Sequence, residues 1–172
     1  MLVLSSGAAG NWDINHTSLT FDSLTEVPSR HPALHNAGGG GTDNPWAEYP
    51  RKVTERNVEM IAKMARRLKS IPEGDGTMLD RTLIIYMSNN GETHHSIKKE
   101  WPLLLIGGKG LGFKTDGRTV IYPREGTTQN RRMSNLFNTM GHAAGEDLNA
   151  FGQEGLSVNE QGELTELWSP VP

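Results

Sequence analysis

The sequence predicts an α/β chain with a mainly parallel sheet and flanking helices in three layers, formed as a single domain over residues 1–172. Two continuous apolar runs, Leu83–Met87 and 103–106, lack the polar alternation of a half-exposed strand. Such runs are typical of strands buried on both faces of a parallel sheet. A third observation, helical spacing of apolar residues over 51–71, supplies a helix to cover that sheet.

Composition narrows the class of protein. The hydrophobic fraction is 35% and glycine is frequent, with 20 residues, so a loop-rich chain with a modest core is expected. The net charge of −3 gives no reason to expect nucleic acid as a partner. Cysteine is absent, which excludes disulfides, thiolate metal sites and a cysteine nucleophile. No apolar run reaches the ~18 residues of a membrane span, and the beginning of the chain lacks a signal-peptide pattern.

The helix expected over 51–71 rests on residues that share one face. Pro50 suits its start, and the glycine- and proline-rich stretch 72–76 ends it. The following residues recur every three or four positions, with Met60 and Ile61 as alternatives at one step: Val53, Asn57, Met60 or Ile61, Met64, Leu68 and Ile71.

Further elements follow the strand at Leu83–Met87. Asn89-Asn90-Gly91 is expected to turn the chain before the strand at 103–106. The stretch 107–112 is too rich in glycine for a helix, and 120–122 is a third, shorter strand. A short helix is expected over 131–140, ended by Gly141, with four side chains facing inward: Met133, Leu136, Phe137 and Met140.

Two polar segments lie outside this frame. Residues 10–50 show no clear periodicity and are expected to form a long loop that is functional or mobile. Residues 153–172 form a polar tail, in which 156–158 and 163–165 are expected to pair as a hairpin.

Metal-competent side chains gather in two parts of the chain. The long loop carries Asp13, His16, His31 and His35. The stretch after the strand Leu83–Met87 carries Asn89, Asn90, Glu92, His94 and His95. Imidazole, carboxylate and amide groups all bind divalent cations, and open α/β sheets place their sites beyond the carboxyl ends of strands. The plainer reading is that the histidines are surface residues and the Asn-Asn-Gly sequence is only a turn.

The segment 79–92, LDRTLIIYMSNNGE, resembles a segment of sulfatases and other enzymes of the alkaline phosphatase superfamily. In those enzymes an aspartate after the strand, with the asparagine or histidine that follows it, binds a catalytic metal. Asn89 stands here at the aspartate position. The segment 101–108, WPLLLIGG, looks like the next strand of the same enzymes. The resemblance implies a truncated sulfatase-like core, because the superfamily's nucleophile belongs to an upstream half.

From about residue 50 to 152 the chain is similar to the C-terminal portion of the bacterial HxxSHH-motif family of unknown function, whose members are often exported. The shared features are a long helix, the segment KSIPEGDGT at 69–77, a strand ending near a histidine-bearing loop and a glycine-rich run. The name-giving motif falls at HPALHN, residues 31–36, with His31 and His35 at its first and fifth positions. By this resemblance an exported or periplasmic protein is expected.

Together the resemblances imply one metal centre and a hydrolase of phosphate, sulfate or related esters. The cofactor would be a divalent cation of the Zn, Ca or Mg class, and the substrate a small-molecule or carbohydrate ester. Glu92 or His95 would act as the base on metal-bound water. The cation would be held by a set of loop residues: Asp13, His16, Asn89, Asn90 and His94, with His31 and His35 as further candidates.

Two other functions fit the same chain. One is a non-catalytic C-terminal fragment or binding module that completes its sheet by self-association, so that a second copy is its partner. The other is a carbohydrate-active hydrolase with paired carboxylates, such as Asp13 with Asp22 or Glu92 with Glu100. No spacing singles out such a carboxylate pair, so this class ranks lowest.

Overall fold

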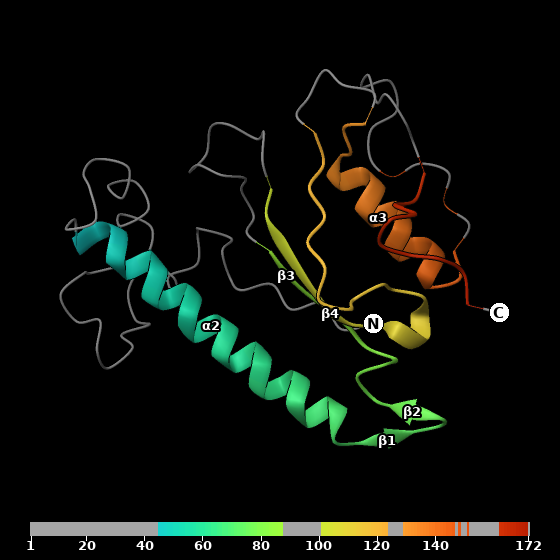
Figure 1. The fold of residues 1–172 in the computed structure, drawn as a ribbon, viewed down its shortest axis with the longest axis horizontal. Coiled ribbons are helices and arrows are strands. Elements are labelled where there is room, and N and C mark those ends of the chain that lie inside the picture. The colour runs from blue at the N-terminus through green and yellow to red at the C-terminus, as the bar shows by residue number, and fades with distance from the viewer. Residues whose placement is uncertain are drawn as a thin grey trace. The chain divides into compact units, whose positions relative to one another are not determined.

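The computed structural model describes residues 45–87, 101–123, 129–146, 148, 151 and 162–171, with the backbone alone for 45–50, 52 and 53. Of these, 67–85 and 104–171 belong to one compact unit, and 45–66, 86, 87 and 101–103 to another. The elements, labelled in Figure 1, are α2 (Pro45–Lys69), β1 (Pro72–Glu73), β2 (Gly76–Thr77), β3 (Leu83–Met87), β4 (Leu103–Gly107), the 3₁₀ turn η2 (Lys109–Leu111) and α3 (Met133–Ala143).

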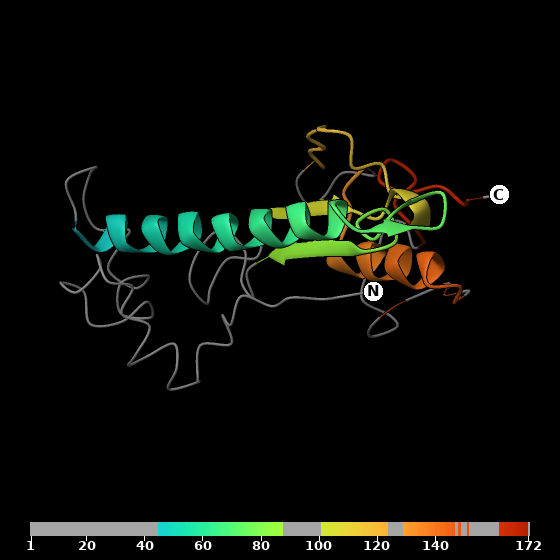
Figure 2. The ribbon, with the colours of Figure 1, turned by 90° about the horizontal axis from the view of Figure 1, so that it is seen from below.

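The expected parallel, three-layer sheet is wrong for this part of the chain. Its strands form two antiparallel two-stranded sheets, β1 with β2 and β3 with β4. In the first, Pro72 pairs with Thr77 and Glu73 with Gly76. Figure 2 shows β3 and β4 side by side, and the end of β4 meets the start of β3 where Gly108 packs on Leu83. The expectation of a truncated sulfatase-like core, which has a mainly parallel sheet, is therefore wrong as well.

The error has a physical cause. A continuous apolar run indicates that both faces of a strand are covered. It does not indicate whether the neighbouring strand is parallel or antiparallel. An antiparallel neighbour needs only a reversal of the chain, whereas a parallel one needs a crossover. β3 fits the prediction in burial, because Leu83, Ile84 and Ile85 are enclosed. β4 does not, because Leu104 keeps 41% of its surface exposed.

The predicted long helix is confirmed as α2, which extends further toward the N-terminus than the expected 51–71. Pro45 stands at its first position, where a missing amide hydrogen costs nothing, and Pro50 lies inside the helix. Ile61 is buried, as the spacing predicts, but Met60 is 50% exposed. Ala65 is also buried, although the predicted face does not include it. The helix ends at Lys69, and the hydroxyl of Ser70, the next residue, donates to the Arg67 carbonyl at 2.7 Å.

The glycine-rich stretch after β4 contains η2, although no helical turn was expected there. The turn forms because glycines flank it on both sides, Gly108 with φ 72° and Gly112 with φ 89°. Residues other than glycine rarely adopt these left-handed angles. The backbone therefore turns sharply at both ends of η2.

The second predicted helix is confirmed as α3. Leu136 and Met140 are buried and Met133 and Phe137 half-buried, as the spacing of 131–140 predicts. Gly141 does not end the helix, which continues to Ala143. A Cβ at Gly141 would lie 2.3 Å from the Leu148 side chain, so the glycine serves close packing rather than termination.

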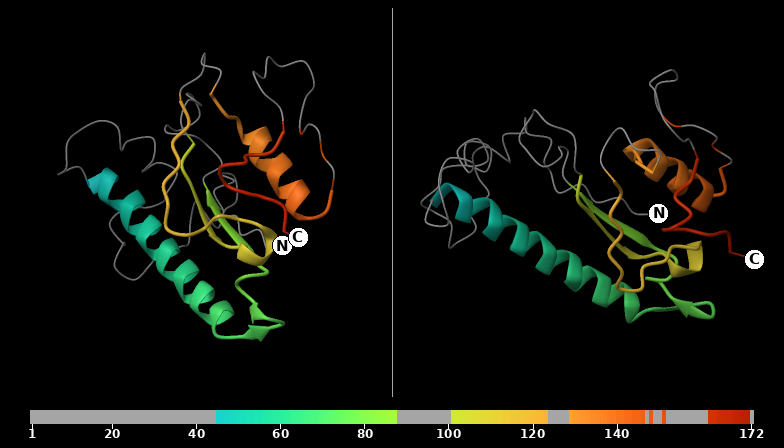
Figure 3. Two further views of the ribbon diagram at one scale, coloured as in Figure 1. Left: turned by 45° about the vertical axis from the view of Figure 1, so that its right-hand side comes forward. Right: turned by 45° about the horizontal axis from the view of Figure 1, so that its top comes forward.

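The buried face of α3 is unusually polar. Asn135, Asn138 and Thr139 are all enclosed and share one face at three- and four-residue spacing. Asn135 Nδ2 donates to the Gly162 carbonyl at 3.0 Å, and the Leu164 amide donates to Thr139 Oγ1 at 2.7 Å. These bonds attach the C-terminal segment, 162–171, alongside the helix (Figure 3).

Thr139→Val is expected to lower the free energy of unfolding by about 1–3 kcal/mol, because it leaves the buried Leu164 amide without an acceptor. Urea unfolding followed by circular dichroism measures the loss. Thr165→Val is the matched control on the attached segment, where the residue is exposed, and should stay within about 0.5 kcal/mol of the parent. Equal effects of the two substitutions would contradict the proposed attachment.

Two predicted strands near the end of the chain are wrong. Residues 120–122 form no strand, and Ile121 is 85% exposed. Residues 163–165 lead into a turn instead of a hairpin strand, while their expected partner 156–158 lies outside the described residues. Within the polar tail, Leu164 and Trp168 nevertheless enter the core, and Trp168 forms a single antiparallel bridge with Phe113.

Candidate functional site

Every residue of the predicted metal and catalytic site lies outside the described part of the chain. The structure therefore neither brings these residues together nor separates them, and the site stays a prediction from sequence. They are Asp13, His16, His31, His35, Asn89, Asn90, Glu92, His94 and His95.

The strand that leads into the predicted site is firmly held at its beginning. Leu83, Ile84 and Ile85 of β3 are buried in succession, and Ser88 follows the strand directly. The carbonyl of Leu79 accepts two hydrogen bonds, from the Thr82 amide at 3.2 Å and the Gly108 amide at 3.0 Å. One atom thus ties the turn before β3 to the end of β4.

Asp80 belongs to the quoted resemblance, and the structure gives it a structural task. Its Oδ2 accepts from the Thr77 hydroxyl at 2.7 Å and the Thr77 amide at 2.8 Å. These two bonds, with smaller contributions from Lys109 and Lys69, hold the pKa of the carboxyl below its usual value. The carboxylate closes the turn between β2 and β3, which is a reason for an aspartate here that involves no catalysis.

Acid should weaken the fold through Asp80. Because its pKa in the folded protein lies below the ordinary 3.8, the stabilising effect is complete above pH 3.8 and is lost as pH falls through the lower folded value. Thermal unfolding between pH 6 and pH 2 should show a smaller acid-induced loss for Asp80→Asn than for the parent. Thr77→Val, which removes the hydroxyl donor alone, should fall between them. Identical acid profiles for the parent and Asp80→Asn would refute this role.

The glycine-rich stretch GGKGLG, residues 107–112, superficially resembles a phosphate-binding loop. Four of its amides, however, already donate within the protein. Gly108 and Gly110 donate to the carbonyls of Leu79 and Asp80, and Leu111 and Gly112 donate within the turn itself. A phosphate cradle needs amides that point at the ligand. These glycines instead allow the backbone to approach 79–82 closely.

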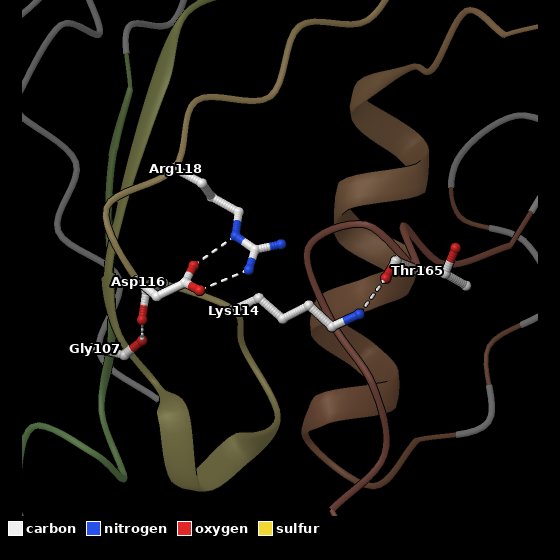
Figure 4. A network of polar contacts seen from close by, with 6 residues as sticks. Gly107, Lys114, Asp116, Arg118 and Thr165 are labelled. Atoms are coloured by element: carbon white, nitrogen blue, oxygen red, sulfur yellow. Dashed lines mark hydrogen bonds and ion pairs between the residues drawn. The ribbon is translucent and has the colours of Figure 1, made fainter.

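Charged residues follow η2, as Figure 4 shows. Asp116 accepts two hydrogen bonds from Arg118, at 2.5 and 2.6 Å. The Arg118 bonds lower the pKa of Asp116, and the same pairing raises the pKa of Arg118. Lys114 Nζ donates to the Thr165 carbonyl at 2.7 Å and so holds the C-terminal segment. Each of these groups therefore has a partner within the fold.

Two buried polar atoms in the described residues have no hydrogen-bond partner, the Tyr122 hydroxyl and Asn138 Oδ1. Burial, assisted by the charge of Glu166, raises the pKa of Tyr122 to about 12. The phenol is therefore neutral at physiological pH. The sequence singles out neither residue, because asparagine is mostly exposed in proteins and tyrosine is buried only in part.

His142 is the one histidine in the described residues. Its place just after the expected helix 131–140 favours an imidazole that caps the helix end over a metal ligand. It lies in the last turn of α3, where its Nε2 makes a 2.7 Å hydrogen bond with the Leu148 carbonyl. Its ring lies 5.9 Å from that of Trp168. The contacts are those of a packing residue.

No group of three or more His, Asp or Glu side chains suited to a metal ion occurs within the ranges that the structure describes. None of the helices in those ranges combines the length and apolarity needed to cross a bilayer. No family model, no curated protein and no solved structure matches the chain. An assignment of function therefore depends on the residues of the chain themselves.

Proposed function

We propose that the chain is a metal-dependent hydrolase of phosphate, sulfate or related esters. The observation that carries the proposal is the sequence SNNGE, residues 88–92, placed immediately after the buried strand β3. Catalytic ligands must be held within a fraction of an ångström, which favours sites that begin on rigid elements. Enclosed residues Leu83, Ile84 and Ile85 make β3 such an element.

The proposed chemistry assigns a separate task to each group. Asp13 and His16, with Asn89, Asn90 and His94, would hold a divalent cation of the Zn, Ca or Mg class. Such a cation lowers the pKa of bound water toward 7 and stabilises negative charge on the ester oxygens. Glu92 or His95 would take the proton from that water. His31 and His35 are further candidate ligands.

Asn89 distinguishes this site from the resembled enzymes, which have aspartate there. An amide oxygen carries no formal charge, so it binds a divalent cation more weakly than a carboxylate does. Asn89→Asp should accordingly tighten metal binding. The substrate class remains small-molecule or carbohydrate esters, by the same resemblance.

Metal binding is the decisive test. Elemental analysis after exchange with Zn²⁺, Ca²⁺ or Mg²⁺ should find about one ion per chain, and isothermal titration should give its affinity. His94→Ala is expected to weaken binding at least about 10–100-fold. His95→Ala is the matched neighbour and is expected to retain the metal. It should lose hydrolysis of aryl phosphate or aryl sulfate where His95 is the base, and Glu92→Gln should do so where Glu92 is the base. His142→Ala, which alters a packing histidine, should leave the metal content unchanged.

Failure would take a definite form. A chain without bound metal, and with no ester hydrolysis that a chelator abolishes, would overturn the proposal. Sedimentation analysis of the same sample tests the alternative function, a non-catalytic module that associates with itself. A metal-free dimer would favour a binding module that associates with a second copy of itself.

A further inference from the structure

We draw no further inference here: the strongest candidate, the exposed apolar pair Val120 and Ile121 in the extended chain beyond the Asp116–Arg118 turn, carries nothing because nothing in the structure shows what covers it.

Discussion

Gly107→Ala and Gly112→Ala are each expected to lower the free energy of unfolding by about 2–5 kcal/mol, which combines left-handed backbone strain with overpacking. A Cβ at Gly107 would lie 2.4 Å from the Thr82 carbonyl oxygen, and one at Gly112 would lie 2.0 Å from that of Ser169. Both obstacles are backbone atoms, so a side-chain rotation cannot relieve them. Chemical denaturation followed by far-ultraviolet circular dichroism measures the loss.

Gly117→Ala separates the two contributions. Gly117 also has a positive φ, 80°, but a Cβ there would meet nothing within 4 Å. Its substitution should cost only the backbone strain, about 1–2 kcal/mol. If all three variants lose the same stability, close approach of the backbone is not the reason for glycine at 107 and 112.

Trp168→Ala is expected to destabilise the protein by about 3–5 kcal/mol, the usual cost of removing a large buried aromatic side chain. Trp168 is buried, pairs with Phe113 and donates from Nε1 to the Leu111 carbonyl at 2.7 Å. Trp168→Phe keeps a ring in the core but removes the donor, so it should cost about 1–3 kcal/mol. Urea unfolding followed by circular dichroism distinguishes the two.

Val171→Ala provides the control for Trp168, because it changes an exposed apolar residue on the same segment. Its effect should remain within about 0.5 kcal/mol. A Trp168→Ala variant as stable as Val171→Ala would show that the C-terminal segment does not contribute to the core. A Trp168→Phe variant as unstable as Trp168→Ala would assign the main effect to the hydrogen bond.

The two helices were predictable from sequence, because their apolar residues recur at helical spacing. The helical spacing that includes Ile61 and Leu68 located α2, and the pair Leu136 and Met140 located α3. Their ends were less predictable. Pro50 is compatible with a helix start but does not require one, and Gly141 satisfies a packing contact that only the folded chain reveals.

The direction of strand pairing and the burial of the C-terminal segment were not predictable from sequence. β4 pairs with β3 in the antiparallel direction, and nothing in their apolar runs encodes direction. Val120 and Ile121 have strong strand propensity, yet propensity alone does not provide a neighbouring strand. Leu164 and Trp168 stand in a polar segment, so composition concealed their burial.

The candidate site was predicted from residue chemistry and from its place after a buried strand. The structure supports only part of the second premise. Leu83–Met87 forms β3 and its first three residues are enclosed, but β3 pairs with β4 in an antiparallel sheet, so the rule for open parallel sheets does not apply. The first premise concerns side chains such as Asn89 and His94, which lie outside the described residues. The metal titration with His94→Ala and His95→Ala is therefore the experiment that bears on the site directly.

The Leu79 carbonyl, which accepts hydrogen bonds from the amides of Thr82 and Gly108, has a consequence for engineering. It joins the turn before β3 to the residue after β4, at the strand ends remote in sequence from 88–100. This tie and the proposed site within 88–100 are thus at opposite ends of the same two strands in sequence. We expect the sequence between the two strands to accept randomisation or replacement by a foreign loop, as in a display library, because the tie between Leu79 and Gly108 does not involve it.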